Sequence, residues 1–426
     1  VCTAYNLARR GRAVRVVEAK AGPGQGSSYI NGTLICPSLM LPWTGPKMIP
    51  KVLQSFLEPR HPLKVHTEAM ADPSLWRFGL HYLKCCRPGQ AEVNTSRLAR
   101  LAAYSRACLE ELLLADPSLA GAMDQTAQGT LQVFENREAM DACLEASAQI
   151  RAAGVPLTVL SPEECSTVDP TVVASWRAQG KEALYLFSEL DTNGDCNKLT
   201  QRLAAACVSM GVKFEYDATV VGLRSDPRGA WGVAFESGRT ALARSVVLCG
   251  GTGSPRLAQM LGVYLPMYPV KGYAITVPLR PGAEQLRGNV VQDSKKLYLA
   301  PLGQGHVRIT GCAEFAGDRA DVDKGRASVL AEQADALLPG MLDLPRATYH
   351  AGLRPLSADD VPILGQVGPQ VYVNTGHGSK GWTHAFGSGQ LLADVMTGRL
   401  PALDLEPYSV HRFWPLRRRL YGNIHE

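Results

Sequence analysis

The feature that most constrains this fold is a glycine-rich stretch near the end of the chain, VNTGHGSKGWTHAFGSGQLLADVM, running from Val373 to Met396. It places five glycines between Gly376 and Gly389 and then continues as a helical pattern. Glycine in an ordered segment costs backbone entropy, so this density indicates a structural need. Two explanations fit: a ligand that lies against the backbone, or a strand–turn–helix that packs tightly through small residues.

The first residues read as the second half of a nucleotide-binding βαβ unit. We expect a helix over residues 1–10, ended by Gly11, and a strand over residues 13–17 followed by Glu18. In such units a carboxylate about 20 residues after the glycine loop binds a ribose hydroxyl. The first strand and the glycine loop are not in the sequence, which suggests a truncation or a late start. Any α/β protein can show the same order, so the motif alone leaves its role open.

Further along, helical patterns are expected over residues 95–114, 137–152, 196–210 and 325–338, whereas residues 42–97 look irregular. The segment GTLQVF reads as a strand, and so does RSVVLCGG, a continuous apolar run that ends at Gly250 and Gly251. A buried strand that ends in glycines is typical of a parallel sheet meeting a ligand at its carboxyl edge.

The order of these patterns predicts an α/β fold built from two domains. Between Met267 and Gly311 three or four strands form an antiparallel meander, which differs in kind from the α/β ends of the chain. We expect a discontinuous, Rossmann-like nucleotide-binding domain and an α+β substrate domain with an antiparallel sheet. The first would comprise residues 1–50, 189–264 and 352–426, and the second residues 51–188 and 265–351.

Charge and cysteine content exclude several classes of protein. The net charge of +5 is small for 426 residues and the basic residues are scattered, so nucleic acid is not an expected partner. The eleven cysteines include no Cys-x-x-Cys pair and no histidine at metal-binding spacing, so no metal is expected. Reduced thiols predict a cytoplasmic protein. No apolar run reaches the roughly 20 residues of a membrane-spanning helix.

The C-terminal tail, HRFWPLRRRLYGNIHE, is the one segment that is both basic and aromatic, with Arg417, Arg418 and Arg419 in a row. Its simpler interpretation is a solvated terminal helix whose aromatic residues pack on the body. The alternative is a peripheral contact with an anionic membrane, on the inner face.

Several motifs together resemble the FAD-dependent amino-acid oxidoreductases, the family that includes D-amino-acid oxidase and glycine oxidase. Within it the chain most resembles the small subunit of the bacterial D-amino acid dehydrogenases. The resemblance covers essentially the whole chain, and its most specific motifs are YPVKGY, GLRPLSADDVPILG and NTGHGSKGWTHAFGSGQLLADVMTG. Two features depart from the family: the glycine loop is outside this sequence, and SSYINGTL carries Thr33 where a glycine is usual.

The resemblance implies bound FAD and oxidation of a free D-amino acid, such as D-alanine, to an imino acid that hydrolyses to a 2-oxo acid and ammonia. Dehydrogenases of this type pass electrons to a quinone or an artificial dye, and the oxidases use oxygen. A third possibility is an impaired relative that binds without catalysis, motivated by the missing glycine loop and Thr33. A nicotinamide enzyme is disfavoured, since the glycine-rich segment has no role there.

The resemblance also implies cofactor-binding residues along the chain. Glu18 would bind the ribose, Val220 would offer its backbone to adenine, and amides from Gly378 to Gly381 would face the flavin edge that becomes negative on reduction. Loop serines are more often simply solvated. The full set is Glu18, Ser27, Ser28, Asn31, Gly32, Val220, Gly250, Gly251, Gly376, His377, Gly378, Gly381, Trp382 and Thr383.

For the substrate, Arg354 in GLRP matches the family's carboxylate-binding arginine, because a guanidinium offers a carboxylate two parallel donors. It could instead pair with Asp359 or Asp360. Tyr298 matches a tyrosine placed over the substrate carboxylate in the oxidases, and Tyr273 is a weaker candidate of the same kind. Either tyrosine could equally be core packing.

Three further residues are more simply explained by structure than by catalysis. Lys271 could balance negative charge near the flavin, but we expect it to be a solvated lysine at a strand end, and we expect His384 to be an interior histidine of the closing helix. His377 would shape the loop beside the flavin. Hydride transfer from a neutral amine needs no general base, because orientation supplies most of the rate.

Overall fold

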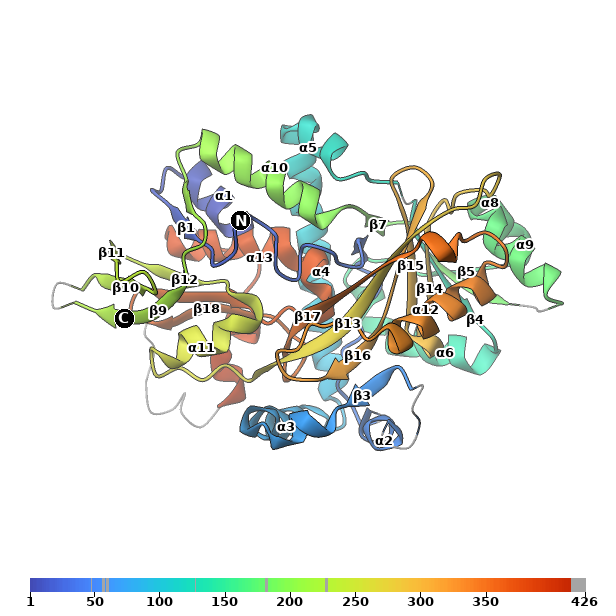
Figure 1. Cartoon of the computed structure of the whole chain (residues 1–426), viewed down its shortest axis with the longest axis horizontal. Helices are drawn as coiled ribbons and strands as arrows, with labels where there is room; N and C mark the ends of the chain where they lie inside the picture. The colour runs from blue at the N-terminus through green and yellow to red at the C-terminus, as the bar shows by residue number, and fades with distance from the viewer. Residues whose placement is uncertain are drawn as a thin grey trace.

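One large sheet dominates one half of the molecule (right-hand side of Figure 1). The computed structural model describes residues 1–414 except 47, 56–57, 59–60, 127, 181–182 and 227–228. The sheet runs in the order β17-β13-β16-β15-β14-β4-β6-β5, with β3 added beside β16. Its strands are β3 (Leu63–Val65), β4 (Thr130–Phe134), β5 (Thr158–Leu160), β6 (Leu184–Ser188), β13 (Met267–Pro278), β14 (Asn289–Gln292), β15 (Leu297–Leu302), β16 (His306–Phe315) and β17 (Thr348–Ser357).

The predicted antiparallel meander is confirmed, since β13, β16, β15 and β14 follow one another as antiparallel neighbours. Strand β17 extends this sheet along the whole length of β13. The helices of this half are α6 (Arg137–Ala146), α7 (Ala148–Ala152), α8 (Pro162–Val168), α9 (Pro170–Ala178) and α12 (Lys324–Leu337).

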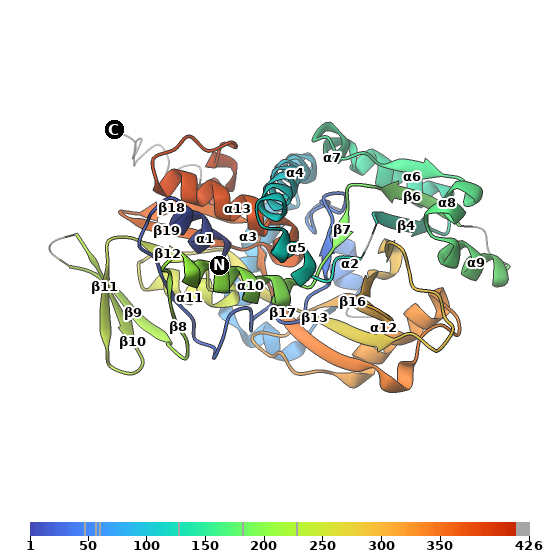
Figure 2. The same ribbon diagram turned by 90° about the horizontal axis from the view of Figure 1, so that it is seen from above.

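The other half holds small sheets with parallel pairs and the remaining large helices (Figures 1 and 2). β1 pairs with β8 in parallel, and β12 pairs in parallel with β19, which also joins β18. A separate three-stranded sheet runs β11-β10-β9, and β2 pairs with β7. The strands are β1 (Arg15–Val17), β2 (Leu34–Ile35), β7 (Thr192–Asn193), β8 (Lys213–Glu215), β9 (Val220–Ser225), β10 (Trp231–Phe235), β11 (Thr240–Ala243), β12 (Val246–Leu248), β18 (Ile363–Gly368) and β19 (Val371–Thr375).

These elements confirm the α/β class with an added antiparallel sheet. The division of the chain into two discontinuous domains stays a prediction, and one of its boundaries, between residues 351 and 352, falls inside β17. Helix α4 lies centrally between the two halves in both views (Figures 1 and 2). The helices beside the small sheets, together with the central α4, are α1 (Cys2–Arg9), α4 (Gln90–Ala115), α5 (Pro117–Ala122), α10 (Cys196–Ser209), α11 (Ser254–Gln259) and α13 (Gly381–Met396).

Helix α13 explains two of the five clustered glycines by packing. A Cβ on Gly387 would lie 2.8 Å from the Cα of Ser105 in α4, and one on Gly389 would lie 2.7 Å from the Cβ of Cys2 in α1. Real Cβ atoms do not approach so closely, so both glycines let neighbouring helices touch α13. Tight packing through small residues therefore accounts for this part of the stretch.

Two expectations about secondary structure are wrong. Residues 42–97 are not irregular, since they contain α2 (Met48–Gln54), β3 and α3 (Pro73–Cys85). Helix α3 begins with Asp72, whose carboxylate accepts the amide of Ser74, and a proline in its first turn, where proline is tolerated. The helix expected over residues 137–152 is two helices separated at Ser147.

We expect Gly387→Ala to lower the free energy of unfolding by about 1–3 kcal/mol, because its new methyl group meets the α4 backbone. The matched control is Gly79→Ala in α3, where a Cβ meets nothing within 4 Å. That change should be neutral or stabilise by up to about 1 kcal/mol through helix propensity. Urea unfolding of both variants measures the difference, and equal effects would contradict the packing explanation.

Candidate active site

Strand β17 brings two distant loops together around Arg354. Ser27 donates its hydroxyl to the carbonyl of Leu353 at 2.6 Å. On the other side, Leu356 forms an isolated β-bridge with His377 of the glycine-rich stretch. The loop of residues 27–33 and the loop of residues 376–381 therefore both attach to the strand segment that carries Arg354.

The guanidinium of Arg354 contacts backbone carbonyls and an aromatic ring. Nη1 donates to the carbonyl of Cys312 at 2.8 Å and Nη2 to that of Gly311 at 3.4 Å. The Cζ atom lies 5.7 Å from the centre of the Trp43 ring. Burial lowers the pKa of Arg354, but arginine stays protonated in proteins. In the described part of the chain no carboxylate forms an ion pair with it.

The alternative partners proposed for Arg354 are engaged elsewhere. Asp359 binds Arg412, with contacts of 2.7 and 2.8 Å to its guanidinium. Asp360 binds Lys380 and accepts the amide of Trp43 at 2.9 Å. The interpretation of Arg354 as the structural partner of these aspartates is therefore wrong, and its charge remains available to an anionic ligand.

Gly272 is required by the position of Arg354. A Cβ on Gly272 would lie between 2.2 and 2.3 Å from the three guanidinium atoms Nη2, Cζ and Nη1. The guanidinium thus rests on the bare backbone of β13, opposite Gly352 in the ladder. Of the motif YPVKGY, the glycine is the residue that shapes the candidate site.

Tyr298 on β15 belongs to the same environment as Arg354. Its hydroxyl donates to Asp293 at 2.9 Å. Burial and Asp293 raise the pKa of Tyr298, whereas the positive charge of Arg354 acts in the opposite direction. The phenol is therefore protonated at neutral pH. The Arg354 guanidinium is close enough to influence its pKa electrostatically.

Tyr273 and Lys271 belong to a different cluster, which corrects two expectations. The Tyr273 hydroxyl donates to Glu314 at 3.2 Å, and Glu314 also binds Arg326 at 2.8 Å and His66 at 2.9 Å. Lys271 is 1% exposed and lies 3.6 Å from Glu314, so it is not a solvated strand-end lysine. The structure does not place the Tyr273 hydroxyl with Arg354, because Glu314 holds it.

The loop of residues 27–33 is held by two elements. Arg308 of β16 donates to the carbonyl of Asn31 at 2.8 Å, and Thr310 would lie 3.2 Å from a Cβ on Gly32. Ser28 hydrogen-bonds Cys196 at the start of α10. Thr33 has a φ of +61°, in the left-handed region that favours glycine, so the residue usual in the family suits this backbone better.

The loop of residues 376–381 also uses left-handed backbone. Gly376 has a φ of +75° and Gly378 a φ of +53°. A Cβ on Gly378 would lie 2.7 Å from Oδ1 of Asp360, and one on Gly381 would lie 3.2 Å from the Cβ of His377. Backbone geometry and close side chains of the protein therefore require these glycines, whether or not a flavin lies beside them.

The histidines of this region are neutral, and His384 is buried whereas His377 is partly buried. His384 is fully buried and its Nε2 lies 3.2 Å from the carbonyl of Leu98, which agrees with an interior role. Nε2 of His377 lies 3.3 Å from the Ser388 hydroxyl. Burial lowers the pKa of His377 to about 4. At the same end of α13, the hydroxyl of Thr383 accepts the amide of Cys36 at 3.1 Å.

The residues expected at the nucleotide end form a second group. Glu18 follows β1, its carbonyl accepts the amide of Ala218, and Val220 begins β9 two residues later. At the end of β12, the carbonyl of Gly251 accepts the Thr375 hydroxyl at 3.4 Å. Gly250 immediately precedes it and is exposed. Gly251 thus adjoins the loop of residues 376–381, whereas Glu18 and Val220 lie together at the β1–β8 edge.

The residues present fit a polar cofactor. Several buried side-chain atoms here have no hydrogen-bond partner among the described residues, which costs free energy unless a bound group satisfies them. They are Nε of Arg308, Oδ1 of Asp360, Oδ1 of Asn374 and Nε1 of Trp382. An FAD molecule would find its ribose ligand in Glu18 and backbone donors in the loop of residues 376–381.

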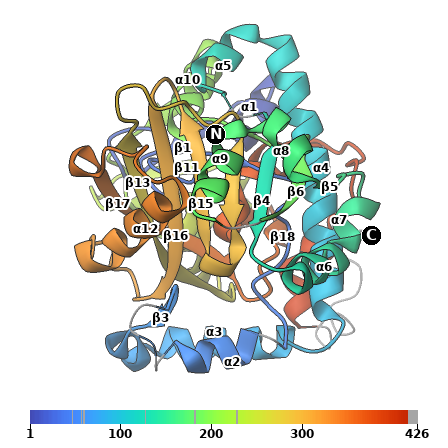
Figure 3. The same ribbon diagram turned by 90° about the vertical axis from the view of Figure 1, so that its right-hand side faces the viewer.

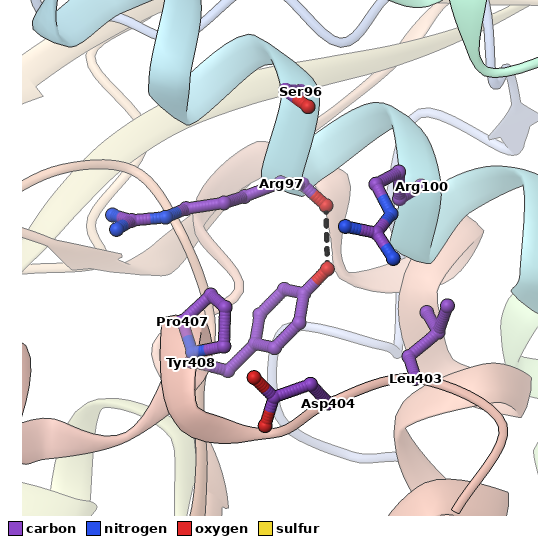
Figure 4. Close-up of a pocket in the computed structure, with 7 residues that line it drawn as sticks. All are labelled: Ser96, Arg97, Arg100, Leu403, Asp404, Pro407 and Tyr408. Carbon is purple, nitrogen blue, oxygen red and sulfur yellow. Dashed lines mark hydrogen bonds between the residues drawn. The ribbon is translucent and has the colours of Figure 1, made fainter.

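Two hollows elsewhere are not candidates for this chemistry. One of about 30 Å³ lies between α4 and the C-terminal segment, where the Tyr408 hydroxyl donates to the carbonyl of Arg97 at 2.7 Å (Figure 4). It has room for about one water molecule. The other, of about 330 Å³, is lined by residues such as Glu189 and Arg287, away from Arg354.

Sequence reasoning missed Trp43, Gly272 and the Asp360–Lys380 pair. Gly272 could have been found, because it stands inside a motif that was already recognised. Trp43 and the ion pair lie far from each other in sequence and show no periodic signal. Asp360 and Gly378 meet only because β17 and the glycine-rich loop are adjacent.

Sequence comparisons identify relatives of the whole chain. A family model described as FAD dependent oxidoreductase (DAO) matches residues 1–395. The D-amino acid dehydrogenase of Paramagnetospirillum magneticum is 37% identical over 413 residues, 96% of this chain and 96% of the relative. That of Cereibacter sphaeroides is 36% identical over 420 residues, 98% of this chain and 94% of the relative.

Solved structures share the fold at lower identity. Glycine oxidase from Geobacillus kaustophilus has a TM-score of 0.73 at 22% identity, covering 96% of this chain and 95% of that chain. L-proline dehydrogenase from P. horikoshii has a TM-score of 0.72 at 18% identity, covering 97% and 94%. These likenesses establish the architecture.

We expect Gly272→Ala to displace the Arg354 guanidinium and to lower kcat/KM for an amino-acid substrate on the order of 100-fold, because a shift of about 1 Å misaligns a bound carboxylate. Gly352→Ala, its ladder partner, is the control, since a Cβ there meets nothing within 4 Å. Steady-state kinetics measure the contrast. A Gly352→Ala variant impaired as strongly would contradict it.

The lowered pKa of His377 predicts that the protein is sensitive to acid. Because its pKa falls from 6.5 to about 4 on folding, the unfolded chain binds a proton that the native state does not within that window. The free energy of unfolding therefore falls as the pH falls, by about 2 kcal/mol between about pH 7 and pH 5. Urea unfolding of the wild type and of His377→Gln at both pH values should show that the variant loses less free energy of unfolding on acidification. Parallel losses would exclude this histidine as the cause.

Proposed function

This chain belongs to the family of FAD-dependent oxidoreductases, and we propose that Arg354 is the residue that binds the carboxylate of its D-amino acid substrate. The reaction is FAD-dependent oxidative deamination, which yields a 2-oxo acid and ammonia. Relatives named D-amino acid dehydrogenase match the chain at 33–37% identity over nearly its full length, and they favour a dehydrogenase over an oxidase. The FAD dependence expected from the motifs is confirmed by the family.

The observation that supports this role is a partly buried guanidinium that forms no ion pair with a carboxylate of the described residues. Desolvating an unpaired charge is costly, and an amino-acid carboxylate would offset that cost through two charge-assisted hydrogen bonds. The Trp43 ring and the carbonyls of Cys312 and Gly311 hold the guanidinium in place. Tyr298 would supply a further polar group on the same side, with its hydroxyl oriented by Asp293.

In this mechanism the chain acts chiefly by orientation. When bound, FAD supplies the hydride acceptor at N5 of its flavin. Arg354 would fix the carboxylate so that the substrate Cα–H points toward the cofactor, and the buried walls would exclude water. The pKa of His377 is lowered to about 4 and that of His384 is also lowered, so both are weak bases, and each forms a hydrogen bond within the protein, to Ser388 and to the Leu98 carbonyl. The proposed mechanism therefore assigns neither of them the role of general base. The imino acid product then hydrolyses in water.

The proposal extends to the electron acceptor and to the cellular location of the enzyme. A quinone-type acceptor is expected from the dehydrogenase relatives, and a peripheral position on the inner face of a membrane would bring the enzyme to it. The basic tail proposed for this contact, with Arg417 to Arg419, lies outside the described residues. An oxygen-dependent oxidase of glycine, sarcosine or a D-amino acid is the alternative, and stoichiometric hydrogen peroxide would identify it. A non-catalytic relative would give neither product.

The first experiment is an absorbance spectrum of the full-length protein before and after anaerobic addition of D-alanine. Flavin bands that bleach establish the reductive half-reaction. Bands that persist with D-alanine, and with a panel of other D-amino acids, would contradict the proposed reaction. A protein that stays colourless after incubation with FAD would support the non-catalytic alternative.

We expect Arg354→Lys to keep bound flavin but to lower kcat/KM by about 100-fold, because lysine cannot offer the two parallel donors that a carboxylate accepts. KM should rise more than kcat falls, since the lost contact exists before the transition state. Arg412→Lys is a matched control, because that guanidinium also binds a carboxylate, that of Asp359, away from the site. Equal kinetics for the wild type and Arg354→Lys would refute the assignment.

A further inference from the structure

Helix α3 has an apolar face toward the core and a second apolar face toward solvent. On the inner side Phe78 is 2% exposed, and its ring lies 5.8 Å from Tyr268 of β13 and 6.2 Å from Phe315 of β16. On the outer side Trp76, Leu80 and Leu83 are 59%, 63% and 52% exposed. Their spacing of i, i+4 and i+7 places them on one stripe of the helix.

Neighbouring residues extend this stripe. The indole of Trp76 donates to the carbonyl of Met70 at 2.7 Å, and the Met70 side chain is itself 40% exposed. Helix α2 lies at the same end of the molecule as α3 (Figures 1 and 3), and its Ile49 is also 40% exposed. We call Met70, Trp76, Leu80 and Leu83 the α3 surface. A soluble protein rarely gathers such large apolar side chains on one exposed helix without a binding role.

Basic side chains border the α3 surface. Arg77, Lys84 and Arg87 are exposed, and none of them forms an ion pair within the described part of the chain. Two acidic residues at the start of α3 are engaged: Glu68 lies 3.8 Å from Arg319, and Asp72 accepts the Ser74 amide and the Tyr268 hydroxyl. The charge beside the apolar stripe is therefore positive.

The C-terminal segment reaches the same helix. The ring of Trp414, the last described residue, lies 5.3 Å from that of His81 in α3. In the sequence, Arg417, Arg418 and Arg419 follow within five residues.

We propose that the α3 surface docks on an anionic lipid bilayer, with α3 lying in the plane of the interface. Exposed tryptophan and leucine beside lysine and arginine are what an interfacial helix presents to acyl chains and anionic headgroups. None of the described helices combines the length and hydropathy needed to cross a bilayer. A second copy of this chain would bring like charges together, which disfavours that occupant. The purpose of docking, access to a membrane-dissolved acceptor, rests on the proposed function.

Vesicle co-sedimentation of the full-length protein tests this surface without requiring turnover. We expect binding to phosphatidylcholine vesicles that contain phosphatidylglycerol, and about tenfold weaker binding for the triple variant Trp76→Ser, Leu80→Gln, Leu83→Gln. The control variant Leu114→Gln, Leu242→Gln, Leu400→Gln changes three leucines that are 81%, 71% and 95% exposed elsewhere. It should bind like the wild type.

The charge contribution is tested separately. Arg77→Glu, Lys84→Glu, Arg87→Glu should weaken binding to the anionic vesicles at least tenfold and reduce its dependence on salt. Unchanged binding by both triple variants would overturn the proposal. So would a wild type that is a dimer and becomes a monomer on changing the α3 surface, because that surface would then be a contact between copies.

The experiments distinguish failure of the proposed reaction from failure of the proposed docking site. Anaerobic bleaching and dye-coupled activity are read in solution, and the α3 variants should retain both. Vesicle binding that depends on the α3 surface, in a protein that oxidises no D-amino acid, would uphold the docking site and refute the reaction. Full activity without vesicle binding would refute the docking site alone.

Discussion

The close approach of the Arg354 guanidinium to the bare backbone of Gly272 is the constraint on which the site depends. It requires β13 and β17 to be adjacent and in one register, with Gly272 opposite Gly352. That register also fixes where Leu353 receives the Ser27 hydroxyl and where Leu356 meets His377. A slip by one residue would turn Arg354 to the other face of the sheet and separate it from both loops.

The distribution of ion pairs leaves this arginine free. Asp359 pairs with Arg412 and Asp360 pairs with Lys380, so neither aspartate pairs with Arg354. The amide of Trp43 also donates to Asp360, while the Trp43 ring lies beside Arg354. The buried Asp360–Lys380 pair thus positions the aromatic neighbour of Arg354 and the glycine-rich loop at once. Oδ1 of Asp360 has no hydrogen-bond partner among the described residues, and it lies so close to Gly378 that a side chain there would not fit.

Sequence patterns predicted the helices and strands, which depend on local periodicity. They did not predict the contacts of individual side chains between neighbouring strands. Helices α4 and α10 and the antiparallel meander follow from the spacing of apolar residues. The sequence ranks Tyr273 below Tyr298 but cannot show which sheet face each side chain occupies. Only the fold shows that the Tyr273 hydroxyl is held by Glu314. Lys271 was misread for the same reason. Helix α3 was missed since its opening proline, favourable in a first turn, was read as a sign of irregular structure.

Strand β13 connects the candidate site to the proposed docking helix. At Gly272 it supports the arginine, and four residues earlier the Tyr268 hydroxyl donates to Asp72, the cap of α3, at 3.0 Å. Phe78 packs on Tyr268 from the same helix. The outer face of α3 can therefore be apolar without loosening the helix, because its inner face and its cap are both fixed to the strand. In the proposed mechanism electrons leave for a lipid-soluble acceptor, and the helix proposed to meet the bilayer is held by the strand that shapes the candidate site.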